Sequence, residues 1–199
     1  MSLATSISHS ALESKIAPLI DTHLIMNALN QIAARDIDQK RGENPLLFAL
    51  SDYLREALTK LDSLHQSVKH DAQLMETHLL LYSNVAHIRI ELEIINLPAT
   101  SVLVSRGMLS KLAITMMKAI RSASNSWHMQ VAFENIDHAS KFLEFCIAIR
   151  SIGFVEKIDL STVRNDLAQL SIIKTRTAML LPVTSASSQV GFRFRTQLH

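Results

Sequence analysis

The stretch PLIDTHLIMNALNQIAARDID, residues 18–38, holds the pattern that decides the fold of the first third of the chain. Its apolar residues recur at helical spacing and share one arc: Ile20, Leu24, Ile25, Ala28, Leu29, Ile32 and Ala33. Three polar residues, His23, Asn27 and Asn30, follow at i, i+4 and i+7 on the opposite face. Pro18 suits the first turn of a helix, where its missing N–H is not needed. The pattern therefore predicts a helix from Pro18 to about Asp38 with His23 on its polar face.

A second amphipathic helix is predicted after a short loop. Asn44 and Pro45 form an N-cap and a first-turn proline. Leucines then repeat at helical spacing up to about residue 69: Leu47, Leu50, Leu54, Leu58, Leu61 and Leu64. Two long helices joined by a short loop predict an antiparallel hairpin. Because one hairpin cannot cover both apolar faces, we expect a homodimer that completes a four-helix bundle, with Leu54 and Leu58 near its centre.

The pattern changes beyond residue 70, where strands and helices follow one another. Alternation predicts strands over residues 87–94 and 127–133. Helical spacing and capping predict helices over 71–83, 107–122, 137–153 and 161–170. The final segments, 171–181 and 189–198, predict a hairpin of strands. The sequence therefore predicts an α+β fold, with a helical hairpin in residues 1–70 and an α/β sandwich in residues 71–199.

Composition narrows the setting in which the protein acts. The chain has 199 residues and a net charge of +2, which is too small to indicate a nucleic-acid or membrane partner. The single cysteine, Cys146, excludes an internal disulfide and is expected to act as a small core residue. Residues 1–15 lack the basic start and apolar stretch of a secretory signal. We therefore expect a soluble cytoplasmic protein.

Glycines and histidines exclude two kinds of site. The four glycines are scattered, at positions Gly42, Gly107, Gly153 and Gly191, so no phosphate-cradling loop is predicted. The histidines do not form a paired ligand motif with cysteines or acids, so no metal site is predicted either. No bound cofactor is expected.

Residues 22–32, THLIMNALNQI, resemble the phosphoacceptor box of a group of sensor histidine kinases, which reads PHFLFNxLNxI. The histidine, both asparagines, the second leucine and the isoleucine match, whereas the proline and both phenylalanines do not. About twenty residues later the family has a Leu-Ser-x-x-Leu-Arg segment, and this chain has LSDYLR at residues 50–55. Together the two motifs, in this order and spacing, are moderately specific.

In that family an α/β ATP-binding domain follows the hairpin, and the later part of this chain has a similar outline. Its ATP motifs are absent. Lys118, in the segment MKAIRS at 117–122, stands where the family has the asparagine that holds Mg²⁺ on ATP. The family's Asp-x-Gly-x-Gly segment has no counterpart in ENIDH at 134–138. The resemblance thus implies a degenerate ATPase domain, and similar ATP-incompetent molecules act as histidine phosphotransferases.

The resemblance implies a role for each polar residue of the first helix. His23 would carry the phosphoryl group, while Asn27 and Asn30 would shape the surface that meets the partner. The partner would be a response-regulator receiver domain, which brings its own Mg²⁺. The alternative is a non-catalytic, pseudokinase-like scaffold that binds a signalling protein while His23 does no chemistry.

The C-terminal residues predict a second polar surface. Lys174, Arg176, Arg193 and Arg195 could form a basic strip if the last two strands pair in suitable register. Alternation would place Phe192 and Phe194 on the other face, toward the core, which disfavours an aromatic platform for nucleic acid. A solvated sheet face is the default interpretation, and a binding face for an acidic partner is the alternative.

Overall fold

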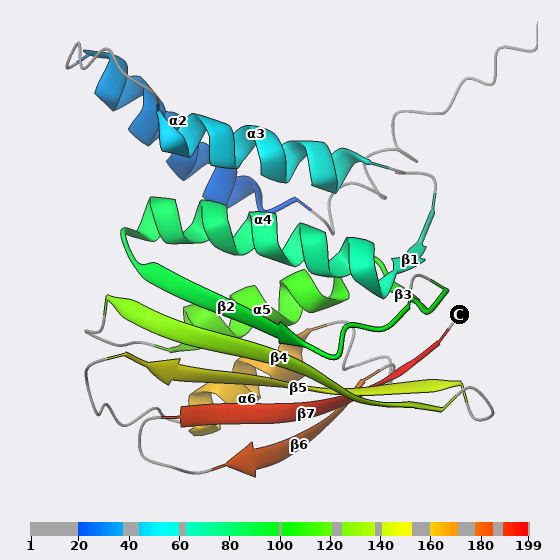
Figure 1. The fold of residues 1–199 in the computed structure, drawn as a ribbon. Coiled ribbons are helices and arrows are strands. Elements are labelled where there is room, and N and C mark those ends of the chain that lie inside the picture. Colours follow the sequence, from blue (N-terminus) through cyan, green and yellow to red (C-terminus); the bar gives the residue numbers. More distant parts are fainter. Residues whose placement is uncertain are drawn as a thin grey trace, which may run out of the picture.

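The described residues form five helices and seven strands. The computed structural model describes residues 20–37, 44–59, 63–99, 101–120, 125–137, 141–152, 160–170, 178–184 and 189–198. The helices are α2 (Thr22–Ile37), α3 (Pro45–Leu58), α4 (Val68–Ala86), α5 (Met108–Ala119) and α6 (Leu160–Gln169). The strands are β1 (His65–Ser67), β2 (Arg89–Ile95), β3 (Leu103–Ser105), β4 (Ser126–Asp137), β5 (Phe142–Ser151), β6 (Ala178–Thr184) and β7 (Gln189–Gln197). Helices α2 and α3 lie over α4, which lies above the sheet (Figure 1). The fold is α+β, as the sequence predicts.

The main sheet has five strands in the order β2-β4-β5-β7-β6. Strands β2 and β4 are parallel, and the other neighbours are antiparallel. In β4 every second residue from Trp127 to Phe133 is buried, which is the alternation of a strand with one face on a core. Phe192 and Phe194 of β7 are also buried, as predicted. A small second sheet pairs β1 with β3.

The helix predicted over residues 137–153 is wrong, because residues 142–151 of this segment form strand β5. Leu143, Phe145, Ile147 and Ile149 are fully buried, while Glu144, Cys146, Ala148 and Arg150 point to the other face. A period of two therefore prevails over the helical spacing that the same apolar residues also allow. Cys146 lies half-buried on the face away from the main core, where burial raises the pKa of its thiol.

The start of the first predicted helix and the end of the second differ from the sequence prediction. Helix α2 begins at Thr22 rather than Pro18, because the Asp21 carboxylate accepts the Leu24 N–H as an N-cap. Helix α3 ends at Leu58 instead of continuing to residue 69, because Thr59 turns to an extended conformation and its N–H bonds the Arg55 carbonyl. The chain then forms β1, and Ser67 caps α4. Pro18 and Leu61 lie outside the described residues.

Helix α4 takes part in two hydrophobic clusters. On one side Val68, Ala72, Met75 and Leu79 belong to the main core cluster, which also contains residues of α5, α6 and the sheet. On the other side, Leu74 and Leu81 pack with α2 and α3 around Ala28, Leu50 and Tyr53. Helix α4 thus covers apolar surface that the sequence assigns to a second copy of the hairpin. The predicted division at residues 70 and 71 falls inside α4 and stays a prediction.

Two buried charged residues connect these layers. The fully buried Asp71 carboxylate of α4 accepts the N–H groups of Gly107 at 2.5 Å and Leu109 at 2.8 Å. It therefore caps α5, whose N-cap residue, Gly107, lacks a side chain. The Arg106 guanidinium donates to the carbonyl groups of Ala57, at 2.8 Å, and Thr59. The turn before α5 is in this way joined both to α4 and to the end of α3.

Candidate functional site

His23 lies in the first turn of α2, and its side chain is exposed. Its neighbours Leu24 and Ala28 are buried against α3 and α4, so the helix holds its polar face outward. A rigid helix with an accessible imidazole satisfies the first geometric requirement of a phosphoacceptor. It also agrees with a plain polar residue on a solvated helix.

Asn27, one turn along α2, contacts His23 directly. The Asn27 Nδ2 atom lies 3.2 Å from the His23 Nδ1 atom. An amide nitrogen only donates, so in this arrangement Nδ1 accepts and the neutral ring carries its hydrogen on Nε2. If the amide turns over, its oxygen accepts an Nδ1 hydrogen and the lone pair of Nε2 is free at the exposed edge of the ring. One side chain can therefore select the tautomer of His23.

Asn30 lies one turn further along the exposed side of α2. Within the described part of the chain, its side chain makes no hydrogen bond or ion pair. The structure thus brings Asn27 to His23, while Asn30 lies apart from them. Their functional roles stay predictions.

If residues 22–32 act as the phosphoacceptor box that they resemble, Asn27→Ala should slow phosphoryl transfer from a phosphorylated receiver domain by about tenfold, the factor expected for the loss of one hydrogen bond. Asn27→Asp should retain transfer, because a carboxylate accepts the Nδ1 hydrogen and leaves Nε2 free. Single-turnover transfer of labelled phosphate measures both rates. Asn84→Ala, on the surface of α4, is the matched control. If the Asn27→Ala protein accepts label at the wild-type rate, Asn27 has no role in the transfer.

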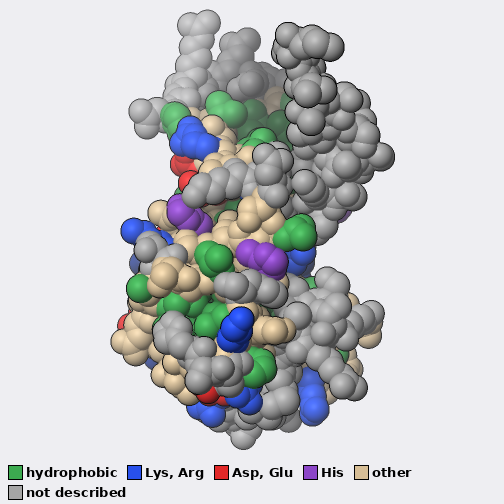
Figure 2. Space-filling model, turned by 90° about the vertical axis from the view of Figure 1, so that its right-hand side faces the viewer, with side chains coloured by type: hydrophobic (Ala, Val, Ile, Leu, Met, Phe, Trp, Pro, Cys, Tyr) green, Lys and Arg blue, Asp and Glu red, His purple; other side chains and the backbone are tan. Residues whose placement is uncertain are grey.

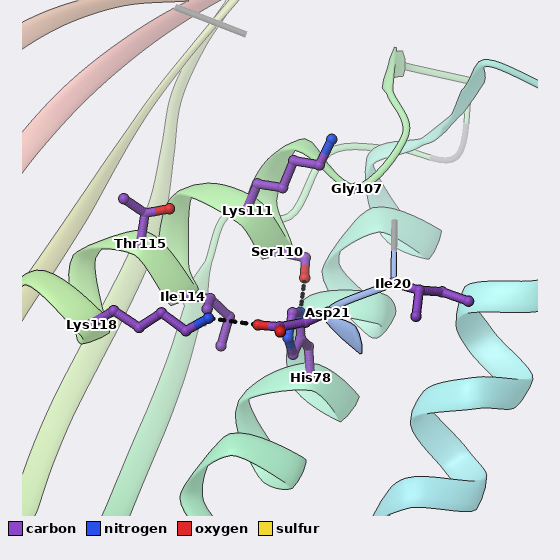
Figure 3. Close-up of a pocket in the computed structure, with 9 residues that line it drawn as sticks. All are labelled: Ile20, Asp21, His78, Gly107, Ser110, Lys111, Ile114, Thr115 and Lys118. Atoms are coloured by element: carbon purple, nitrogen blue, oxygen red, sulfur yellow. Dashed lines mark hydrogen bonds and ion pairs between the residues drawn. The ribbon is translucent and has the colours of Figure 1, made fainter. Parts of the chain in front are cut away.

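A second group of polar residues lies close to the start of α2. The Lys118 ammonium of α5 lies 2.6 Å from the Asp21 carboxylate (Figure 3). Burial alone would raise the pKa of Asp21, but the bonds from Lys118 and the Leu24 N–H outweigh burial and lower it. The Tyr53 hydroxyl accepts the Asp21 N–H at 3.1 Å. The residue before the histidine helix is therefore attached to both α5 and α3.

His78 of α4 completes this group. Its Nδ1 atom lies 2.6 Å from the Ser110 hydroxyl, and its ring lies 4.6 Å from the Tyr53 ring between centroids. Burial lowers the pKa of His78 to about 4, although the Asp21 charge opposes the shift. The imidazole is thus neutral at physiological pH.

The sequence analysis did not identify this group, because its contacts join residues that are 32 and 97 positions apart. A partial signal exists in α5, where Ser110, Lys111, Thr115 and Lys118 form a polar stripe on an otherwise apolar helix. The partners from α4 and from the start of α2 are fixed only by tertiary packing.

The outer face of the sheet does not present an open basic strip within the described residues. Arg193 donates to Glu134 at 3.3 Å, and Arg195 pairs with Glu144 at 3.5 Å. The Arg195 guanidinium also lies 4.2 Å from the centre of the Phe142 ring. Lys174 and Arg176 lie outside the described residues. The two described arginines are therefore paired with acids from neighbouring strands, as on an ordinary solvated sheet face.

Charged side chains are also dispersed on the end of the molecule shown in Figure 2, where basic, acidic and histidine residues lie among apolar ones. In the described parts of the chain, no three His, Cys, Asp or Glu side chains come together as a possible metal site. Among the helices that the structure describes, none has both the length and the apolar character needed to cross a membrane.

The chain matches no protein-family model and no curated protein sequence. The solved structures to which the chain is similar include histidine kinase domains, at TM-scores below 0.5. The catalytic domain of the histidine kinase ThkA has a TM-score of 0.45 and 9% identity, over 67% of this chain and 94% of that chain. The histidine kinase domain of the blue-light activated kinase EL346 from Erythrobacter litoralis has a TM-score of 0.43 and 11% identity, over 94% of this chain and 95% of that chain.

A structure of ThkA in complex with the response regulator protein TrrA has a TM-score of 0.44 and 12% identity, over 96% of this chain and 63% of that chain. These similarities concern the arrangement of helices and strands. What the chain does depends on its own side chains.

Proposed function

We propose that the protein is a histidine phosphotransferase that exchanges phosphoryl groups with response-regulator receiver domains through His23, without using ATP. The observation that carries the proposal is the exposed His23 imidazole in contact with Asn27 on a helix whose other face is buried. The match of residues 22–32 and 50–55 to the phosphoacceptor motifs supports it. Transfer of label from a phosphorylated receiver to the wild type and to His23→Ala tests it directly.

The transfer step needs few groups from this chain. The unprotonated ring nitrogen of His23 attacks the phosphorus atom of the receiver's aspartyl phosphate. The new N–P bond forms as the P–O bond to the aspartate breaks, and the carboxylate leaves with the bonding electrons. The other ring nitrogen keeps its hydrogen, which the Asn27 oxygen can accept. Positioning and charge neutralisation supply most of the catalysis in such reactions, and the receiver provides its own Mg²⁺.

The alternative function is a scaffold that binds a regulator by shape. The stacking of α2 and α3 on α4 favours it, because such a surface can bind a partner without any reaction. Label transfer distinguishes the two functions, since a scaffold binds the receiver and never acquires phosphate.

We expect no ATP binding. Lys118, where the related kinases place a metal-holding asparagine, is bound to Asp21. No pair of nearby glycines is available to form a lid. Calorimetric titration with Mg-ATP should give no saturable heat. A micromolar dissociation constant would contradict the prediction and the alignment of Lys118 with the kinase motif.

We also expect a homodimer formed by α2 and α3. Even with α4 in place, Met26, Leu29, Leu47, Phe48 and Leu58 are between 44% and 57% exposed. Leu54, in contrast, is partly buried inside the protomer, so the exposed residues are the better candidates for the contact. Replacing Phe48 by Glu should convert the dimer to a monomer, because a carboxylate in an apolar interface loses its hydration.

Light scattering at micromolar concentration measures this change. Leu97→Glu is the matched control, because Leu97 is 40% exposed but follows β2 in the chain and belongs to neither helix. A wild-type protein that is already monomeric would contradict the predicted dimer. Dissociation by Leu97→Glu but not by Phe48→Glu would place the contact elsewhere.

A further inference from the structure

A cavity lies where α4, α5 and the start of α2 meet. Its volume is about 170 Å³, and its polar lining consists of Asp21, His78, Ser110, Lys111, Thr115 and Lys118 (Figure 3). The volume is below the roughly 300 Å³ at which pockets for drug-sized ligands begin, so only a small molecule or ion fits. The phosphotransfer reaction does not use this cavity.

His78 lines the cavity and has one buried ring nitrogen without a hydrogen-bond partner. The side chain is 5% exposed, and its Nε2 atom has no hydrogen-bond partner among the described residues. Within the described residues, the hydrogen-bond partner of the Ser110 hydroxyl is His78 Nδ1, at 2.6 Å, so we assign its hydrogen to that bond. Nδ1 is then an acceptor, and the neutral ring carries its own hydrogen on Nε2. A buried N–H without a partner is rare in native proteins and indicates a missing ligand or water.

The charges of the lining add to this donor. Two lysines and one aspartate give the cavity one net positive charge, because His78 is neutral. Lys118 has three N–H donors and uses one of them on Asp21. Lys111 makes no hydrogen bond or ion pair within the described residues, and burial lowers the pKa of its ammonium against the opposing attraction of Asp71. An anion would therefore meet the donors of both lysines, in competition with the carboxylates of Asp21 and Asp71.

Figure 3 shows how these donors lie. Lys118 points toward Asp21 beside His78, whereas Lys111 extends toward Gly107, away from His78. Because the lysine stem is flexible, the Lys111 ammonium can turn toward a bound group. A ligand between the two lysines would accept from His78 Nε2 at its inner end.

We propose that this cavity binds a small oxyanion, a phosphate or carboxylate group, held by the His78 Nε2–H and by the ammonium groups of Lys111 and Lys118. The proposal is independent of phosphotransfer by His23. It assigns a ligand to a part of the described chain where a cavity, an unsatisfied buried ring nitrogen and an excess of positive charge in the lining coincide.

Calorimetric titration of the full chain with inorganic phosphate and, separately, with malonate tests the proposal, with sodium chloride at matched ionic strength as the reference. We expect saturable binding of at least one of the two anions. Phosphate binding alone would indicate a phosphate site, and malonate binding alone a carboxylate site. Absence of saturable binding of both, at concentrations up to about 10 mM, would overturn the proposal and leave water as the partner of His78.

Two variants locate the bound anion. Lys111→Gln removes a charge without breaking an ion pair, and His78→Phe keeps the ring beside Tyr53 while removing the Nε2–H. Each should weaken binding by about tenfold. Lys69→Gln is the control, at an exposed position of α4. It should change the affinity for the anion less than twofold, because an exposed charge contributes little to an interaction. Equal binding by wild type, Lys111→Gln and His78→Phe would overturn the proposed location.

Nitrogen NMR of wild-type His78 gives a readout that needs no variant. The ring should be a neutral Nε2–H tautomer, and the Nε2 signal should shift as the anion saturates. An Nδ1–H tautomer, or an Nε2 signal that does not respond while the anion binds, would also overturn the proposal.

Discussion

Replacing His23 by Ala should abolish the transfer of label from a phosphorylated receiver domain. The expected adduct on the wild type is labile in acid and stable in base, as a phosphoramidate is and a phosphoester is not. His23→Gln should fail likewise, because glutamine has no nucleophilic ring nitrogen. Since the side chain is exposed, the free energy of unfolding should change by no more than about 0.5 kcal/mol. Phosphate label and denaturant unfolding, measured on the same preparations, check both parts.

His87→Asn is the matched control for this experiment. His87 is another exposed histidine, at the C-cap of α4 with φ 54°, a left-handed conformation that asparagine tolerates. This variant should accept label at the wild-type rate. If the wild type binds a receiver tightly but never acquires label, and His23→Ala behaves in the same way, the scaffold function replaces the transferase. Loss of label in His87→Asn but not in His23→Ala would show that His87, and not His23, accepts the phosphoryl group.

Local patterns in the sequence are enough to predict most of the elements. The alternation in β4, the N-cap Asn44 with its following proline in α3, and the buried phenylalanines of β7 all appear where the pattern places them. The errors arise where one pattern permits two structures. The apolar residues of β5 fit both a helix and a strand, and only pairing with β4 and β7 decides between them.

Among the polar groups, too, local contacts can be predicted from the sequence and contacts that depend on tertiary packing cannot. His23 and Asn27 are one helical turn apart, so their contact follows from local geometry. The cavity around His78 depends on how α4 packs on α5 and on where the chain enters α2. Neither can be obtained from periodicity, and His78 is preceded and followed by sequence that reads as an ordinary amphipathic helix. The sequence likewise does not reveal that the apolar residues of α4 divide between two hydrophobic clusters, because they form one broad apolar surface.

Asp71 is expected to give the largest stability effect in the chain. Its carboxylate accepts the N–H groups of Gly107 and Leu109 and the Gln66 amide, so Asp71→Ala leaves several buried donors without partners. At roughly 1–3 kcal/mol for each unsatisfied group, the loss should be about 3 kcal/mol or more near pH 4. Urea unfolding followed by circular dichroism measures it. Asp52→Ala, which removes an exposed carboxylate from α3, should cost less than about 1 kcal/mol.

The effect of Asp71 should also depend on pH. Burial raises the pKa of this carboxyl group to about 6, against the opposing hydrogen bonds from Leu109, Gln66 and Gly107. The folded protein therefore holds the proton more tightly than the unfolded chain, whose Asp71 has the ordinary pKa of 3.8. The stabilisation linked to this proton is complete below the unfolded pKa and is lost as the pH rises through the folded one. The difference in unfolding free energy between wild type and Asp71→Ala should accordingly shrink between pH 4 and pH 7, by on the order of 3 kcal/mol. A difference that grows over this interval would show that the hydrogen bonds outweigh burial and that the folded protein favours the ionised carboxylate.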